Sequence, residues 1–318
     1  MKYFFSILIS TYSLHLYGQQ ADTTLEIPEH GYFSYRYEND VFTSTDYYYT
    51  QGVKATLVLP VLKQSPLHIL LASLPRSTNE SNGVFLQQDC YTPTNLAADS
   101  LLNHDRPYAG AIFAGEFRVS NDKLRYRRIT SGIDLGMLGR CAMCEEEQKA
   151  IHRALVDQQP LGWGFQIRPD VLFNYSLGFD QGIWVSHVVE FILQGKMEAG
   201  TYKDNLSGGG LFRVGLMKAY FNPLGLSRGR NEREFYAFLQ GSASFVAYNA
   251  LLQGGLIDRD NPYVIQASGV MRMVYKFSAG YTISIKKFSF TYSQTYLSPE
   301  FEGGLNHAWG SITLQYRF

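Results

Sequence analysis

The most constraining feature of this chain is a strict two-residue alternation of apolar and polar side chains near its C-terminus. The apolar members are Ile312, Leu314, Tyr316 and Phe318, and the polar ones are Ser311, Thr313, Gln315 and Arg317. The segments 275–286 and 288–293 repeat the alternation. This period places successive side chains on opposite faces of a β-strand. The chain is therefore expected to form sheets with one apolar and one polar face.

About twelve segments of this kind lie along the chain. They are 31–40, 49–60, 83–91, 108–119, 124–137, 163–175, 183–195, 207–220, 234–248, 269–285, 287–297 and 307–318. Even strand numbers and aromatic-rich apolar faces are typical of transmembrane barrels. A soluble sandwich or small barrel would alternate too, but its interior would be apolar. With 23 Tyr and 21 Phe, the sequence favours an all-β transmembrane antiparallel barrel of about 12 strands.

The connections divide into short turns and long loops. Short turns are expected at 120–122, 179–182 and 286–287, and long connections at 92–107, 138–162, 249–266 and 298–306. The 221–233 connection is long but falls on the short-turn side. In outer-membrane barrels the short turns face the periplasm and the long loops face outward. The ends of the first five strands should therefore bring several polar segments to one outer rim.

The N-terminus has the pattern of an export signal. Lys2 precedes an apolar stretch that ends near Gly18, and a polar segment follows. We expect residues 1–18 to be a signal peptide and 19–318 an outer-membrane barrel domain; a buried first strand or short helix is the alternative. Elsewhere the sequence contains no run of 18 apolar residues, which a membrane-spanning helix would need. An exported chain without a membrane helix is either soluble in the cell envelope or a β-barrel. We expect the protein to lie in the outer membrane of a Gram-negative bacterium, with its active site towards the cell exterior.

Charge and cysteine content narrow the possible partners. Lys plus Arg and Asp plus Glu each number 28, so nothing favours nucleic acid, and an apolar or amphipathic partner is expected. Cys141 and Cys144 could bind zinc, but a lone pair is a weak metal signal. We expect these two to form a structural or oxidised pair, and Cys90 to be a small strand residue.

One segment, 144–155, has helical character in this β-rich chain. It carries Gln148 and His152 four residues apart, on one helix face. A histidine on a helix is more often a surface or packing residue than a catalyst. This helix, however, is expected above the barrel mouth in an outer loop, where a neutral imidazole could take a proton from water. His152 is therefore the candidate general base.

Oxygen donors gather at the end of the first strand. The alternation places Glu38 and Asp40 on the lumen side, with Asn39 between them. An Asn-Asp pair can simply begin a turn, but the following segment 41–52 adds carboxylates and hydroxyls suited to a hard cation such as calcium. Arg106 opens the fourth strand at the same rim. It could pair with a carboxylate, or it could hold a phosphate of the substrate, and the sequence leaves both possibilities open.

Several of these motifs together resemble the LpxR-type family of outer-membrane lipid A deacylases. They are Glu38-Asn39-Asp40, Asp46 with Tyr49-Thr50-Gln51-Gly52, Tyr91-Thr92-Pro93, Asp105 to Gly110, and Gly139, Gln148, His152, Gly162-Trp163 and Gln166. The resemblance covers residues 31–175 by motif and the remainder only as strands. It implies a barrel, expected as a monomer, that removes the 3′-O-linked acyloxyacyl chain of lipid A, a lipopolysaccharide component, from the outer leaflet.

The resemblance also assigns roles to individual residues. It implies a calcium-associated site at Asn39, Asp40 and Thr50, arranged with the help of Gln148, and His152 as the base that activates water. Two positions depart from the family pattern. Gln158 stands where members can carry a glutamate, with Asp157 as a neighbouring substitute, and 94–100 lacks the basic residue proposed to assist.

Two rival functions remain open from the sequence. One is a porin or structural barrel whose polar lumen conducts water and ions. The other is a serine-type outer-membrane phospholipase, which needs an activated serine beside a histidine. None of the seven histidines begins a His-x-Ser motif, so the second rival has no motif to support it.

Overall fold

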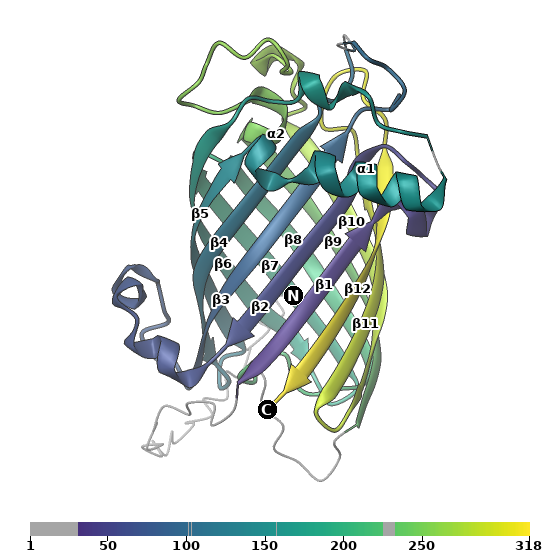
Figure 1. Cartoon of the computed structure of the whole chain (residues 1–318). Coiled ribbons are helices and arrows are strands. Elements are labelled where there is room, and N and C mark those ends of the chain that lie inside the picture. The colour runs from purple at the N-terminus through teal and green to yellow at the C-terminus, as the bar shows by residue number, and fades with distance from the viewer. Residues whose placement is uncertain (1–30, 101, 103, 157, 225–232) are drawn as a thin grey trace, which may run out of the picture.

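The protein is a closed barrel of twelve antiparallel strands (Figure 1). The computed structural model describes residues 31–100, 102, 104–156, 158–224 and 233–318. The strands are β1 (Tyr32–Asn39), β2 (Tyr48–Val58), β3 (Asn79–Thr92), β4 (Ala109–Asp122), β5 (Arg127–Leu138), β6 (Asp170–Val185), β7 (Val189–Gly200), β8 (Lys203–Leu216), β9 (Arg233–Asn249), β10 (Met273–Ile285), β11 (Phe288–Leu297) and β12 (His307–Arg317). β1 pairs with β12 and closes the barrel. The predicted fold class and strand number are confirmed.

Short helices occupy the connections between the strands. They are α1 (Cys144–Leu155), α2 (Ala250–Gln253) and the 3₁₀ helices η1 (Asp40–Thr43), η2 (Pro60–Gln64), η3 (Pro66–Leu70), η4 (Arg140–Ala142), η5 (Gly162–Phe165) and η6 (Ala267–Gly269). The expected bounds of the helix, 144–155, agree with those of α1. No helix of the described residues is long and apolar enough to cross a membrane.

The two faces of the barrel wall differ as the alternation predicts. Phe33, Leu86 and Phe277 are among the large apolar side chains exposed on the outer wall, which is the outward face of the strands. On the lumen side, Glu38 accepts a hydrogen bond from the Tyr49 hydroxyl, 2.9 Å away. The outer wall is thus suited to lipid and the lumen to polar groups.

The two ends of the barrel differ in the length of their connections. We call the end at which the odd-numbered strands finish the loop rim, and the opposite end the turn rim. The loop rim carries the long connections 93–108, 139–169 and 250–272. The turn rim carries the tight connections 123–126, 186–188 and 286–287, but also the long connection 59–78.

Several expected boundaries were wrong. The expected turn 179–182 lies inside β6, because Asp180 points into the lumen and accepts a hydrogen bond from Tyr220, 2.7 Å away. β6 begins at Asp170 rather than at residue 163, which belongs to η5. The turn expected at 120–122 lies at 123–126. The signal peptide expected at 1–18 lies outside the described residues.

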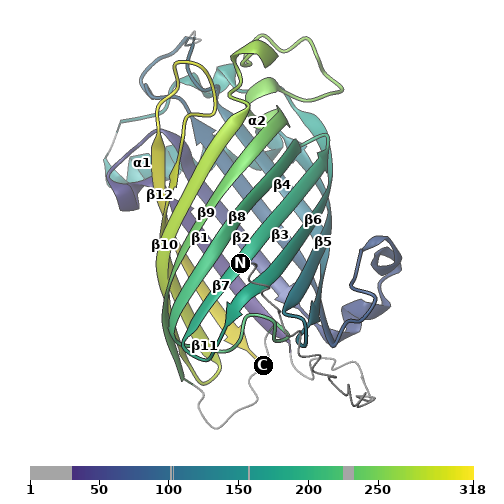
Figure 2. The ribbon, with the colours of Figure 1, turned by 180° about the vertical axis from the view of Figure 1, so that it is seen from behind.

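The position of α1 and the cysteine pairing also differ from expectation. α1 crosses the outer wall near the loop rim instead of lying above the mouth, and the two opposite views agree on this (Figures 1 and 2). The disulfide joins Cys90 to Cys144, and Cys141 is free and exposed. The expected Cys141–Cys144 pair was wrong because Cys90, on the outer wall of β3, faces the first residue of the helix.

Candidate active site

A covalent bond and an apolar cluster fix the start of α1 to the outer wall. Around the Cys90–Cys144 bond, Tyr108, Ala142 and Trp163 form a buried cluster. The Tyr108 and Trp163 rings lie 4.7 Å apart between centroids. Gly110 on β4 makes room for this contact, because a Cβ at this position would lie 2.8 Å from the Cys144 sulfur. The start of α1 therefore packs at a defined position on β3 and β4.

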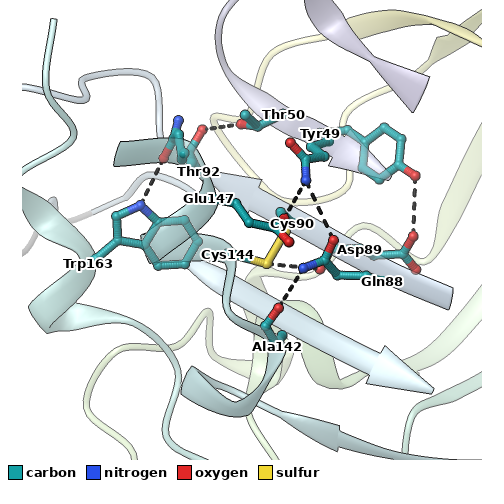
Figure 3. Close-up of a disulfide and its surroundings, with 12 residues drawn as sticks. Tyr49, Thr50, Gln88, Asp89, Cys90, Thr92, Ala142, Cys144, Glu147 and Trp163 are labelled. Carbon is teal, nitrogen blue, oxygen red and sulfur yellow. Dashed lines mark hydrogen bonds between the residues drawn. A yellow bond between two sulfur atoms is a disulfide. The ribbon is translucent and has the colours of Figure 1, made fainter. Parts of the chain in front are cut away.

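Hydrogen bonds also attach the start of α1 to the outer wall. The Gln51 amide on β2 donates to Glu147 in the first turn of α1, at 2.6 Å. The Gln88 amide on β3 donates to the carbonyl of Ala142, also at 2.6 Å. Figure 3 shows the bond between Gln88 and Ala142, with Glu147 beside the disulfide. Together they bring the ends of β2 and β3 against the residues that begin the helix.

The buried face of α1 carries both residues that the sequence singled out. Cys144, Gln148 and His152 follow at intervals of four and are the buried residues of the helix. The Gln148 carbonyl oxygen accepts a hydrogen bond from the Trp163 indole, 2.8 Å away. An indole nitrogen can only donate, so the amide nitrogen of Gln148 must point away from Trp163. This nitrogen is buried and has no hydrogen-bond partner within the described chain.

The hydrogen bond of His152 fixes its tautomer. Its Nδ1 lies 2.6 Å from the backbone carbonyl oxygen of Gln158. A carbonyl only accepts, so Nδ1 carries the proton and Nε2 of the neutral ring keeps its lone pair. Gln158 thus contacts His152 through its main chain. Asp157 lies outside the described residues.

Asn39 and Asp40 end β1 and begin η1. The Asn39 side-chain oxygen accepts from the Val41 backbone nitrogen at 2.8 Å and so caps η1. An Asp40 carboxylate oxygen accepts from the Tyr47 nitrogen at 2.9 Å. Burial, together with the nearby carboxylate of Asp46, raises the pKa of Asp40 to about 8. Two carboxyl groups close together in a poorly hydrated place form a site that a cation would stabilise.

Asp40 does not share the lumen face of Glu38. Its strand has already turned into η1, whose Phe42 ring packs edge-on against the rings of Tyr37 and Tyr292 on the outer wall. The lumen expectation therefore holds for Glu38 only, and Asp40 belongs to the side of the barrel on which α1 lies.

Thr50 occupies a β-bulge. Tyr49 pairs with Tyr91 and Gln51 with Cys90, which leaves Thr50 as the extra residue of β2. Bulges redirect side chains and are frequent beside active sites. The Thr50 hydroxyl lies 2.6 Å from that of Thr92 on β3 (Figure 3). The bulge lets Tyr49 face the lumen while Gln51 reaches α1.

The oxygen-rich residues have the chemistry of a calcium site. Among the described residues there is no group of three or more His, Cys, Asp and Glu placed to hold a metal. Calcium, however, accepts carbonyl and hydroxyl oxygens together with carboxylates. Asp40 offers a buried carboxylate, and the oxygens of Asn39 and Thr50 keep lone pairs beyond the hydrogen bonds described. This donor set fits a hard cation.

Arg106 lies apart from this group. It is fully buried at the loop rim, where it pairs with Glu300, and its guanidinium stacks 3.9 Å from the centre of the Tyr91 ring. Of the two possibilities left open by the sequence, the structure favours the ion pair. A direct role in substrate binding stays a prediction.

Three residues that contact the site, Thr92, Glu147 and Trp163, were not assigned a role from the sequence. Trp163 and Thr92 lie in motifs that carry the resemblance, so their place in those motifs was the available signal. Glu147 had no signal, because one glutamate among three at the start of a helix is explained by the helix dipole alone.

Comparisons with known proteins agree with this architecture. A family model described as outer membrane protein LpxR matches residues 4–318. Among solved structures, LpxR from Salmonella typhimurium superposes with a TM-score of 0.72 at 17% identity, over 90% of this chain and 99% of that chain. The β domain of the Bordetella autotransporter BrkA gives 0.45 at 10% identity, over 91% and 99%. No curated protein matches the chain by sequence.

Proposed function

The chain belongs to the family of the outer membrane protein LpxR, and from this membership and the site on its outer wall we propose that it is a lipid A deacylase. The proposed reaction is hydrolysis of the 3′-O-linked acyloxyacyl ester, with calcium as cofactor. The loop rim is proposed to face the cell exterior, and the protein to act as a monomer.

One observation carries the proposal: Gln148 and His152 lie on the buried face of α1, outside the barrel wall (Figure 1). A substrate whose acyl chains stay in the membrane approaches a barrel from the side, and not through its lumen. Next to its buried face, α1 exposes Ile151 and Leu155, and Val156 directly after the helix is exposed as well. Such apolar side chains at the surface of a membrane protein suit contact with acyl chains.

The proposed mechanism uses His152 as general base. Its Nε2 takes a proton from a water molecule, whose oxygen attacks the ester carbonyl carbon. The tetrahedral species then breaks its bond to the sugar oxygen, which takes the proton back from the imidazolium, and the fatty acid leaves. The Gln148 amide nitrogen, which has no hydrogen-bond partner among the described residues, would donate to the oxyanion that forms on the carbonyl oxygen.

Asp40, with the oxygens of Asn39 and Thr50, would hold the calcium ion. Bound there, the ion would supply positive charge near the developing oxyanion. Asp40 would then be ionised, because a cation beside it offsets the burial that now raises the pKa of this carboxyl to about 8.

The experiment is a deacylation assay with purified full-length protein, lipid A and calcium in detergent, read by mass spectrometry. Loss of a general base lowers the rate by about 10²–10⁴-fold, and we expect this for His152→Ala. His187→Ala, which alters an exposed histidine in the 186–188 turn, is the matched control. A chelator should stop the wild-type reaction. Fatty-acid release by His152→Ala at the wild-type rate would refute the assigned base.

A further inference from the structure

The 59–78 connection is unusual for its place in the barrel. It joins β2 to β3 at the turn rim, where 123–126 and 286–287 are tight turns. It contains η2 and η3, and Figure 1 shows it beside the outer wall, projecting sideways from the lower end of the barrel. Long connections at such positions commonly have a function.

The outer wall satisfies the backbone of this connection. Three successive carbonyls, those of 70–72, accept hydrogen bonds from the Tyr175 hydroxyl, the Arg118 guanidinium and the Ser131 hydroxyl, at 3.2, 3.2 and 2.9 Å. In water such carbonyls need no protein partner. In lipid every backbone polar group requires one. The outer wall therefore supplies each of these carbonyls with the partner that a lipid environment would require.

Charged side chains of the outer wall beneath the connection also make polar contacts. Arg118 forms an ion pair with Glu80 at 2.5 Å, and Glu116 accepts a hydrogen bond from the Ser65 hydroxyl at 2.6 Å. These charged side chains lie on the outer wall, where an uncovered charge would be costly. Covering them is a second sign that this part of the wall and the connection form one unit.

The other side of the connection is apolar and exposed. Ile69 is 86% exposed, and Val61, Leu67 and Leu70 are exposed as well. Between η3 and the wall lies an apolar groove of about 500 Å³, lined by Phe33, Leu57, Leu67, Val84, Leu86 and Leu135, among others. Its size falls within the range of small-molecule sites, roughly 300–1,000 Å³.

The charge of the connection indicates the kind of lipid. Residues 59–78 contain Lys63 and Arg76 and no acidic residue. Lys63 makes no ion pair among the described residues. Basic residues beside an apolar interfacial surface attract anionic headgroups.

We propose that the 59–78 connection is a lipid-binding element of the leaflet that meets the turn rim. Its occupant is a glycerophospholipid with an anionic headgroup: one acyl chain lies in the groove beneath Leu67, the headgroup lies near Lys63, and Ile69 is immersed among the acyl chains. This site is at the opposite end of the barrel from α1 and is independent of the proposed deacylase activity.

The first test locates the connection. A nitroxide label is placed at Ile69→Cys in a Cys141→Ser background, with the full chain in vesicles of phosphatidylethanolamine and phosphatidylglycerol. We expect the label to be accessible to oxygen and shielded from a water-soluble nickel complex. Ile257→Cys, an exposed isoleucine of a loop-rim connection, should show the reverse. If the nickel complex reached the label at Ile69 as readily as the label at Ile257, the proposal would be overturned. That result would mean that the connection lies in water, where it could meet a protein partner.

The second test measures lipid retention. Protein in detergent is titrated with phosphatidylglycerol, and bound lipid is counted by mass spectrometry of the intact complex. Leu67→Asp should lower retention by about tenfold, which corresponds to about 1.4 kcal/mol, because a charge replaces an apolar side chain that lines the groove. Leu216→Asp puts the same charge on the outer wall of β8 at the same rim and should retain lipid normally. If Leu67→Asp fails to fold, the milder variant Leu67→Ala tests the same contact. Equal retention by the wild type and both Leu67 variants would sink the proposal.

Discussion

At the residue scale, each catalytic candidate on α1 is oriented by a partner with only one possible hydrogen-bonding role. The Trp163 indole can only donate, and it holds the oxygen of Gln148. The Gln158 carbonyl can only accept, and it holds the proton of His152 on Nδ1. Both partners leave the other polar atom of the side chain for the substrate. The Gln158 departure therefore does not deprive His152 of its partner, since any residue supplies that carbonyl.

This arrangement predicts the effect of Trp163→Phe. The substitution keeps an aromatic ring in the cluster with Tyr108 but removes the donor to Gln148, so the amide can turn. The loss of one hydrogen bond, about 0.5–1.5 kcal/mol, corresponds to a decrease in kcat of up to about tenfold. KM should change less, because the amide is proposed to act on the oxyanion. Trp184→Phe, at an exposed tryptophan of β6, is the matched control; an unchanged kcat in Trp163→Phe would contradict the role of Gln148.

At the element scale, the position of α1 depends on the disulfide that joins its first residue to β3. A disulfide closing a loop of this kind typically contributes about 2–4 kcal/mol, and Cys144 is the first residue of the helix. Cys144→Ser should therefore loosen α1 and lower deacylation while the barrel stays closed. Hydrogen exchange of residues 144–155, compared with the β10–β11 hairpin, would measure this. Cys141→Ser removes the free thiol and should change neither; full protection of α1 in Cys144→Ser would show that the noncovalent contacts suffice.

The elements also show what the sequence could predict. Twelve strands and the bounds of α1 follow from local periodicity, which each segment carries in its own residues. The turn at 179–182 was misplaced because a polar lumen accepts Asp180 within a strand. The disulfide was misassigned because Cys141 is near Cys144 in sequence, whereas Cys90 is near it only through the pairing of β3 with β4 and the packing of the helix on both. The site side chains named from the sequence stay a prediction, and their position outside the wall depends on tertiary contacts that local periodicity does not carry.

At the scale of the whole molecule, the barrel is filled at the loop rim. Phe113, Tyr202 and Leu251 belong to an apolar cluster there, and the Arg106–Glu300 pair lies beside it. Two polar cavities of about 280 and 420 Å³ lie inside the barrel, each with its own lining residues. A porin needs a continuous water path, and the apolar cluster and the buried ion pair occupy part of the lumen at the loop rim.

The Arg106–Glu300 pair allows a structural role to be separated from substrate binding. Removing one partner of a buried ion pair typically costs about 3–5 kcal/mol, because the other charge stays buried and unpaired. Arg106→Met should therefore lower the thermal unfolding temperature in detergent, and Arg106→Met/Glu300→Gln should recover most of the loss. If the pair only closes the loop rim, the double variant should also recover the wild-type KM for lipid A. If KM stays raised in the stable double variant, Arg106 binds the substrate, which is the second of the two roles considered for it in the sequence analysis.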